Sequence, residues 1–170
     1  MELPDNQLAD TGELHLAWLD YYRQTVERKL AGLSSTELTT SRLPSGWSPL
    51  ELVKHLVYME HRWIRWGFLA EPFDEPWGDS GGAEDEPWRL APGDSLDSLL
   101  TQMRAGGERT RQVVGGREDL AEHAAAGGRF SVAEERPTLN WVLFHVLQEY
   151  ARHVGQLDIA RELADGGTGE

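Results

Sequence analysis

The sequence predicts an all-α protein, a four-helix bundle with long crossover connections. Four segments repeat apolar residues at the i, i+3, i+4 spacing of an amphipathic helix, and no run of residues has the pattern of a strand. Two long connections separate the last three of these segments, which is typical of bundles with crossovers. The chain has 170 residues, of which 39% are hydrophobic. We therefore expect a single domain over residues 1–170 with a sizeable core.

The first two predicted helices have clear starts. Asp10 can cap the first helix, and Glu13 stands at the spacing of a capping box. Its apolar stripe comprises Leu14, Trp18, Tyr21, Tyr22, Val26, Leu30 and Leu33. Ser48 can cap the second helix, Pro49 suits the first helical position and Glu51 completes a capping box. One face of this helix, as far as Gly67, carries Leu52, Leu56, Met59, Trp63 and Trp66.

The third predicted helix is the weakest and the fourth is the longest. Asp94 can cap the third, but Gly106-Gly107 interrupts it, since each glycine costs about 1 kcal/mol relative to alanine. Its apolar residues are Leu96, Leu99, Leu100, Met103, Thr110, Val113 and Val114. The fourth follows Pro137-Thr138 and stops at Gly166-Gly167, because glycine is the expected residue just past a last turn. Its stripe comprises Leu139, Val142, Leu143, Val146, Tyr150, Val154 and Leu157.

Two long connections complete the chain. Residues 71–94 are acidic, rich in proline and glycine, and contain Trp77 and Trp88. Connections of this length are functional lids or disordered segments, and the two tryptophans favour a cover folded over one end of the bundle. Residues 115–137 form the second connection.

Composition excludes several classes of function. The chain contains no cysteine, which rules out disulfides, thiolate zinc sites, iron–sulfur clusters and a cysteine nucleophile. The net charge of −13 disfavours nucleic acid as a partner. The N-terminus has no apolar signal segment, and no stretch is long enough to span a membrane. We therefore expect a cytoplasmic protein without nucleic-acid or membrane partners. The sequence has no phosphate-binding glycine loop and no nucleophile elbow.

Polar residues near core positions suggest a metal site. At 100° per residue, His153 lies about 40–60° and Glu149 about 80–100° from the centre of the fourth stripe, whereas His145 lies near the outer face. Glu149 and His153 are i and i+4, so both project to one side. His55 lies beside Leu56 on the second stripe. These three side chains can supply ligands to zinc, nickel or iron(II) and leave one coordination position open.

Other interpretations of the same residues stay open at this point. A Glu/His pair at i, i+4 also occurs as a surface pair, and a buried histidine is often simply hydrogen-bonded. Arg152 can contact a substrate carboxylate or belong to a solvated face. Asp158 and Arg161 are surface residues or form an interhelical ion pair. Four tryptophans can either line the mouth of a pocket or pack in the core: Trp63, Trp66, Trp77 and Trp88.

Two blocks of sequence carry a resemblance to a known family. They are GWSPLELVKHLVYMEHRW, residues 46–63, and LNWVLFHVLQEYARHVGQLDIARELADGGTG, residues 139–169. The chain resembles the DinB-like superfamily of metal-binding four-helix bundles, in the branch named for the mini-circle protein. Relatives include mycothiol-dependent maleylpyruvate isomerase and bacillithiol S-transferases. The specific residues are His145, Glu149, Arg152, His153, Gly155, Asp158, Arg161, Glu162, Asp165 and Gly166.

The resemblance implies both a ligand set and a chemistry. The metal ligands carried over are His55, Glu149 and His153, with His145/Glu149 and His145/His153 as alternative combinations. The implied cosubstrate is a low-molecular-weight thiol of the mycothiol type, which a divalent metal holds as thiolate for attack on a small electrophile.

Several functions are compatible with this chemistry. We expect a metal- and thiol-dependent transferase or isomerase. A homodimer is compatible with this expectation. The alternatives are a metal-dependent hydrolase, a non-catalytic metal- or ligand-binding stress protein, and a purely structural dimer. A local positive patch from Arg62, Arg65 or Arg152 would be needed to attract an anionic electrophile.

Overall fold

The computed structural model describes residues 2–72, 89–131 and 135–168. In this part of the chain, His123 and Thr138 form an isolated antiparallel bridge, and there is no strand. The prediction of an all-α protein is confirmed. The elements in chain order are α1 (Thr11–Leu30), α2 (Ser35–Thr39), α3 (Pro49–Glu60), the π-helix η1 (His61–Phe68), α4 (Leu96–Gly115) and α5 (Leu139–Asp165).

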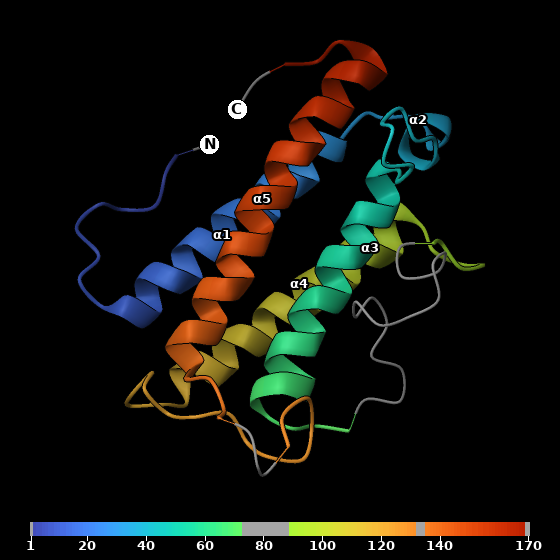
Figure 1. The fold of residues 1–170 in the computed structure, drawn as a ribbon. Helices are drawn as coiled ribbons and strands as arrows, with labels where there is room; N and C mark the ends of the chain where they lie inside the picture. The colour runs from blue at the N-terminus through green and yellow to red at the C-terminus, as the bar shows by residue number, and fades with distance from the viewer. Residues whose placement is uncertain (1, 73–88, 132–134, 169–170) are drawn as a thin grey trace.

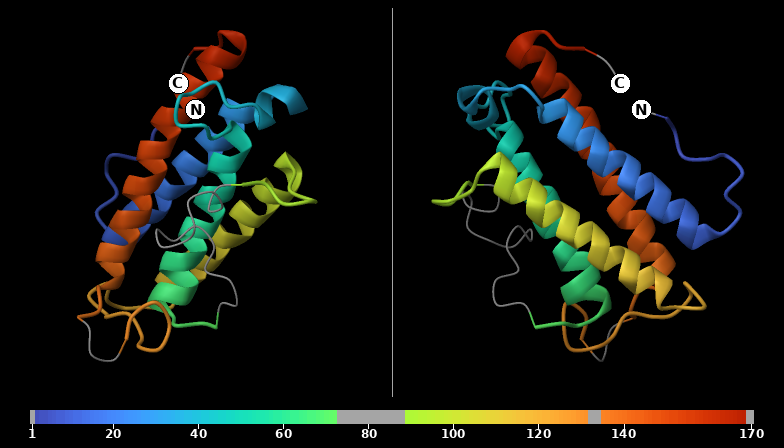
Figure 2. Two further views of the ribbon diagram at one scale, coloured as in Figure 1. Left: turned by 45° about the vertical axis from the view of Figure 1, so that its right-hand side comes forward. Right: turned by 180° about the vertical axis from the view of Figure 1, so that it is seen from behind.

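Four long helices form a closed bundle. α1 packs against α4 and α5, and α3 packs against the same two helices. α1 and α5 run in one direction, while α3 and α4 run in the opposite direction (Figure 1 and Figure 2). η1 therefore ends at one end of the bundle and α4 begins at the other, so residues 69–95 connect the two ends. This is the long crossover that the sequence predicts.

The predicted helix starts are correct for three of the long helices. Asp10 Oδ1 accepts from the Glu13 amide at 2.8 Å. Ser48 and Glu51 form a complete capping box at the start of α3. α5 begins after Thr138, whose side chain accepts from the amide of the third helical residue. It ends at Gly166, which adopts the left-handed conformation with φ of 76°, so a glycine is favoured there.

The buried face of α1 differs from the prediction. Leu14 is exposed, while Trp18, Tyr21 and Tyr22 are only half-buried. These three aromatic rings contact one another, with centroids 5.5–6.0 Å apart, so each ring covers part of its neighbours, and Tyr22 also packs against the core. The residues that α1 buries include His15, Leu19, Val26 and Leu30.

The second predicted helix changes its geometry half-way along. α3 ends at Glu60 and the chain continues as a π-helix, in which each turn takes up one more residue. A Cβ atom at position 67 would lie only 2.8 Å from the carbonyl oxygen of Arg62. Glycine at this position therefore permits the wider turn. The sequence pattern, which assumes an α-helix as far as Gly67, does not reveal this change.

The π-helix rotates the following side chains relative to the predicted face. Ile64 and Phe68 are buried in the core, at 1% and 2% exposure. Trp63 and Trp66, which the sequence places on the core stripe, are half-buried. The extra residue per turn is the physical reason for this correction.

α4 differs from the sequence prediction in its N-cap and in its continuity through the two glycines. Its N-cap is Ser95, not Asp94; Asp94 forms an ion pair with Lys54 of α3 at 2.8 Å. The Gly106-Gly107 pair does not interrupt the helix. A Cβ atom at position 107 would lie 2.9 Å from the guanidinium of Arg23, so the absence of a side chain makes room for a buried arginine. Tertiary packing offsets the low helix propensity of glycine here.

A short helix was missed by the periodicity. α2 has a complete capping box between Ser34 and Glu37, which is the signal that could have found it. Its five residues are too few for a helical stripe to emerge in a window of 11–18 residues.

A buried carboxylate links all four long helices. Glu60 of α3 accepts from Arg23 Nη2 of α1 at 2.5 Å, from Thr110 Oγ1 of α4 at 2.5 Å and from the Tyr150 hydroxyl of α5 at 2.9 Å. Although burial alone would raise it, the pKa of Glu60 is lowered by the charge of Arg23 and by these hydrogen bonds. The carboxylate is therefore ionised and fixes the rotation of α5 about its axis.

The two long connections differ in how far the structure describes them. Trp77 and Trp88, and with them most of the predicted cover, lie outside the described residues. The second connection, residues 116–138, docks on the end of η1: the Ala125 amide donates to Phe68 O and the Arg129 amide to Trp66 O. In the described part of the chain, no helix has the length and apolar character needed to cross a membrane.

Candidate metal centre

The bundle brings His55, Glu149 and His153 together between α3 and α5. The candidate ligand atoms of the three side chains all lie within 4.8 Å of one another. Glu149 Oε2 is 3.1 Å from His153 Nε2 and 3.7 Å from His55 Nε2. Both imidazoles are buried, at 8% and 5% exposure. Within the described ranges this is the one such group of histidine and acidic side chains.

These separations are compatible with a tetrahedral ion. Ligand bonds of about 2.1 Å in tetrahedral geometry place neighbouring ligand atoms about 3.4 Å apart. The two nitrogen–oxygen separations, 3.1 and 3.7 Å, lie on either side of that value. The His55 and His153 rings meet edge to face, with centroids 4.7 Å apart. Three protein ligands at such a site leave one coordination position for another molecule.

Gln156 orients the ring of His153. Its side-chain oxygen lies 2.6 Å from His153 Nδ1. Because this oxygen accepts, Nδ1 carries the hydrogen, and the neutral ring keeps its lone pair on Nε2, which faces Glu149. In that form two electron pairs meet across 3.1 Å, an arrangement that a cation between them stabilises. Without a cation, a hydrogen on Nε2 is shared with Glu149 Oε2, and this is the hydrogen bond that acts on the pKa of Glu149. A partner such as Gln156 behind a ligating histidine is typical of metal sites.

The electrostatics of the cluster suit a divalent cation. Burial lowers the pKa of the His55 imidazole, and the neighbouring His153 and the charge of Arg62 act in the same direction. His55 is therefore neutral at pH 7, as a metal ligand must be. The hydrogen bond with His153, together with the nearby ring of His55, holds the pKa of Glu149 far below its usual range. A carboxylate with two imidazoles is a donor set that zinc accepts.

His145 lies outside this cluster. Its ring is half-buried and sits 4.1 Å from the Trp63 ring and 5.2 Å from the Trp141 ring, stacked on the latter. Neither alternative combination with His145 forms a metal-binding group in the part of the chain that the structure describes. The outward position expected for His145 is correct only in part, because the two tryptophans cover the ring.

The arginines that the sequence singled out occupy different environments. Arg62 is buried, at 4% exposure, and its charge acts on His55. Arg65 forms an ion pair with Glu71 at 2.7 Å. Arg152 is exposed on α5, and its role as a substrate contact stays a prediction.

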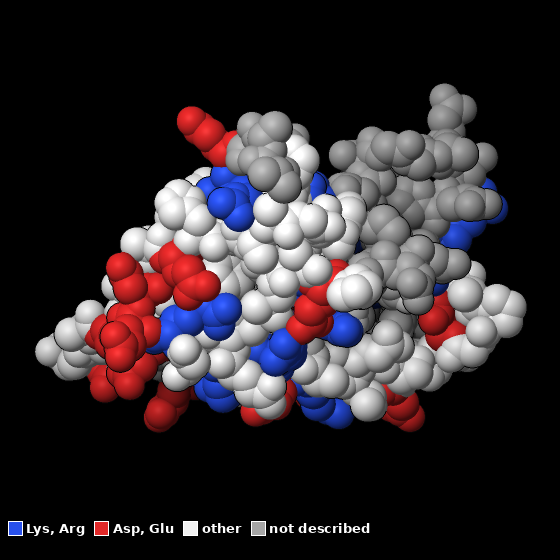
Figure 3. Space-filling view, turned by 90° about the horizontal axis from the view of Figure 1, so that it is seen from below, with Lys and Arg blue, Asp and Glu red and all other residues white. Residues whose placement is uncertain are grey.

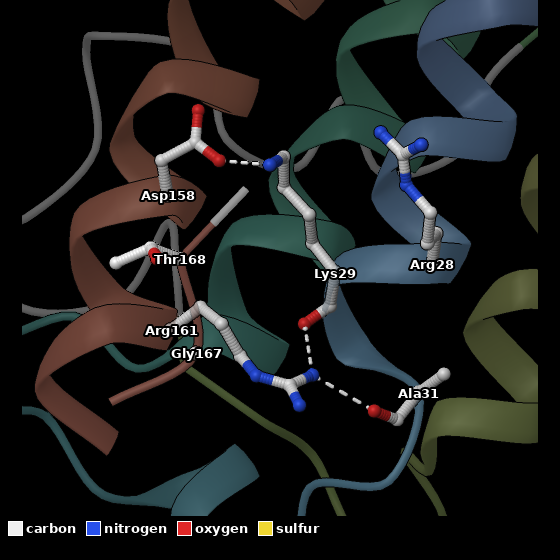
Figure 4. A pocket seen from close by; sticks show the side chains of 7 residues that line it. All are labelled: Arg28, Lys29, Ala31, Asp158, Arg161, Gly167 and Thr168. Atoms are coloured by element: carbon white, nitrogen blue, oxygen red, sulfur yellow. Dashed lines mark hydrogen bonds and ion pairs between the residues drawn. The ribbon is translucent and has the colours of Figure 1, made fainter. Parts of the chain in front are cut away.

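Asp158 and Arg161 hold α1 and α5 together. Figure 4 shows them in a pocket near the C-terminal ends of both helices. Asp158 forms an ion pair with Lys29 of α1, as one of the two interpretations predicts. Arg161 Nη1 donates to the carbonyl oxygens of Lys29 and Ala31 at 2.9 and 2.8 Å, which satisfies carbonyls at the end of α1. Asp158, Lys29 and Arg161 thus join the two helices.

On the face seen from below, charged side chains are scattered among uncharged ones (Figure 3). Seen from below, acidic residues gather at one side of the molecule, and elsewhere Lys and Arg are interleaved with Asp and Glu (Figure 3). This face has no continuous basic surface of the kind that binds a phosphate backbone.

A four-helix bundle with a His/Glu/His cluster on two facing helices is the class of protein that the fold and the site define. The sequence model of the mycothiol S-transferase family matches residues 14–166. The chain therefore belongs to the mycothiol S-transferase family, which agrees with the predicted resemblance to DinB-like bundles.

Structural comparison shows the same fold elsewhere. The crystal structure of a conserved protein from Enterococcus faecalis superposes with a TM-score of 0.63 and 18% sequence identity. The match covers 91% of this chain and 97% of that chain. The search of the curated proteins gives no match.

Proposed function

We propose that this protein is a divalent-metal-dependent S-transferase that uses mycothiol, or a thiol of that kind, as its cosubstrate. The observation that carries the proposal is the cluster of the buried His55 and His153 with the half-buried Glu149, whose donor atoms lie within 4.8 Å of one another. Membership of the mycothiol S-transferase family supports the choice of thiol. The metal is zinc, or alternatively nickel or iron(II).

The residues of the candidate metal centre would have different roles toward the sulfur of the cosubstrate. His55, Glu149 and His153 would hold the cation, and Gln156 keeps the lone pair of His153 on Nε2. A divalent cation bound there would lower the pKa of a coordinated thiol, so that the thiol is ionised at neutral pH. Because the chain has no cysteine, the reacting sulfur must come from the cosubstrate.

The reaction is nucleophilic transfer to carbon. The thiol loses its proton to solvent, the sulfur forms a bond to an electrophilic carbon, and a leaving group departs with its bonding electrons. Where addition is followed by elimination of the same thiol, the net result is an isomerisation. The buried charge of Arg62 near His55 would favour an anionic group near the site despite the net charge of −13.

The test is elemental analysis followed by a thiol-consumption assay. The freshly purified protein is expected to contain about one divalent cation per chain and to consume mycothiol with 1-chloro-2,4-dinitrobenzene. Glu149→Gln and His153→Ala should lose both properties. Gln148→Ala, an exposed position on the same helix, is the matched control and should retain both.

Other outcomes separate the alternatives. A bound cation without thiol turnover would favour a metal- or ligand-binding stress protein, and metal-dependent hydrolysis of esters or amides without thiol would favour a hydrolase. Protein that binds no divalent cation would contradict every version of the proposal. A cytoplasmic location and a homodimer remain predictions from the sequence, to be checked by fractionation and by light scattering.

A further inference from the structure

An aromatic pocket lies at the end of the bundle where α5 begins. It has a volume of about 480 Å³, within the range of small-molecule sites. Its apolar walls are Trp63 of η1, Phe130 and Pro137 of the second connection, and Trp141 of α5. The Trp63 ring lies 5.5 Å from that of Trp141 and 6.3 Å from that of Phe130. Polar groups also line it, from His123, Glu135, Arg136 and Thr138.

The pocket follows the same seam between α3 and α5 as the candidate metal centre. Trp141 precedes Glu149 by eight residues, about 12 Å along a helix. His145 stands between them, stacked on Trp141 and 4.1 Å from the Trp63 ring. It lies one helical turn before Glu149. A ligand about 12 Å long would span the separation between the metal centre and the pocket along α5.

Two contacts hold the second connection against η1 beside the pocket. The second connection is tied to η1 by the hydrogen bond from the Arg129 amide to Trp66 O at 3.1 Å. The Arg129 guanidinium also lies 4.5 Å from the centre of the Trp63 ring, a cation–π contact. A preformed site loses little conformational entropy on binding.

We infer that this pocket binds the apolar tail of the electrophile, an alkyl or aryl group that extends about 12 Å from the reacting carbon. The inference rests on the proposed function for the identity of the reaction, but the binding itself does not. Trp141 is 49% exposed, so it offers apolar surface that a ligand would remove from water. Trp63, Phe130, Pro137 and Trp141 make most of the exposed surface of the pocket apolar, which favours an apolar group.

A series of electrophiles with one reactive group tests the inference. N-alkylchloroacetamides with methyl, butyl, hexyl and octyl groups all react in the same way: a sulfur–carbon bond forms, chloride leaves and the thiol proton goes to the buffer. With mycothiol as the thiol, KM should change little for the short chains. It should fall by up to about fourfold for each methylene that enters the pocket, while kcat stays nearly constant.

Two exposed aromatic residues on α5 give a matched pair of variants. Trp141→Ala should abolish the dependence of KM on chain length, because it removes one apolar wall of the pocket. Phe144→Ala, 63% exposed and outside the pocket, should keep the dependence. Equal KM values for all chain lengths in the wild-type protein would overturn the inference.

Equilibrium binding separates this inference from the proposed function. Unreactive N-octylacetamide should bind the chelator-treated protein in calorimetry, and Trp141→Ala should weaken this binding at least tenfold. If it binds in this way and no thiol turnover is found, the pocket assignment stands and the proposed function fails. If turnover is found but N-octylacetamide does not bind, the pocket assignment fails alone. Trp141-dependent binding of methyl glucoside in its place would also overturn the assignment.

Discussion

At the scale of single residues, the side chain that hydrogen-bonds to a metal-binding histidine determines which of its ring nitrogens can bind the metal. The Gln156 oxygen receives the Nδ1 hydrogen of His153 and so decides which nitrogen offers a lone pair. No pattern in the sequence singles out Gln156. Its position three residues after His153, on the same side of the helix, is the signal that could have found it.

Gln156→Leu should weaken divalent-cation binding by roughly 10- to 100-fold, the usual cost of losing a partner behind a metal-binding histidine. The affinity is measured by competition with a chromogenic chelator. Gln148→Leu makes the same substitution at an exposed position of α5 and should leave the affinity unchanged. Equal affinities for the two variants would contradict the role assigned to Gln156.

The carboxylate of Glu60 makes stability depend on pH. Its pKa is lowered in the folded protein, whereas in the unfolded chain it is about 4.3. As the pH falls below the unfolded value, the unfolded state binds a proton that the folded state does not. This contribution to stability is therefore present at neutral pH and is lost in acid, by up to about 1.4 kcal/mol per pH unit.

Glu60→Gln should show a shallower loss of stability between pH 5 and pH 3 than the wild type, because the amide does not titrate. At pH 7 the variant should be less stable by about 3 kcal/mol, since the buried Arg23 loses the ionised Glu60 and keeps only the half-buried Asp20, at 2.9 Å, as an acidic partner. Urea unfolding at several pH values measures both effects. Parallel pH profiles would show that Glu60 has no lowered pKa.

At the scale of the element, the junction of α3 and η1 positions the aromatic pocket. The wider turn moves Ile64 and Phe68 into the core and leaves Trp63 half-buried at the pocket wall. Gly67 permits this turn because the carbonyl oxygen of Arg62 occupies the place of its missing side chain.

Gly67→Ala should destabilise the protein by roughly 1–3 kcal/mol, since the added carbon meets a backbone oxygen that cannot move freely. Gly155→Ala is the opposite case. Gly155 is exposed in α5 and an added Cβ atom has no neighbour within 4 Å, so alanine should stabilise by about 0.5–1 kcal/mol through helix propensity. Thermal unfolding compares the two, and a stabilising Gly67→Ala would refute the packing argument.

At the scale of the whole molecule, the candidate metal centre joins two helices that are far apart in sequence. His55 comes from α3, while Glu149 and His153 come from α5. A ligand that binds only the folded state stabilises it by RT ln(1 + c/Kd), where c is the concentration of free ligand. A cation at this centre would therefore act as a cross-link between the two halves of the bundle.

Removal of the metal should lower the melting temperature. For a cation at 100 times its dissociation constant, the folded state gains about 2.7 kcal/mol, which corresponds to roughly 5–10 °C for a chain of this size. Differential scanning calorimetry with and without a chelator measures the change. His153→Ala should show almost no response to the chelator. A wild-type melting temperature that ignores the chelator would favour a purely structural pair of histidines.

Local features of the fold could be predicted because their causes are local. The start of α3 at Ser48 and the end of α5 at Gly166 follow from capping groups within a few residues. The pairing of Glu149 with His153 follows from the helical spacing alone. His55 could be added because the apolar stripe fixes which face of a helix is buried.

The remaining features depend on contacts between distant segments. The sequence by itself determined the helix class, most of the helix ends and the three side chains of the candidate metal centre, since periodicity and capping act over one or two turns. Only the tertiary structure decided that Gly107 leaves room for Arg23, that the chain widens into a π-helix before Gly67 and that Trp63 meets Trp141 beside a pocket. Those outcomes require the close approach of atoms from different helices, and no local pattern encodes that approach.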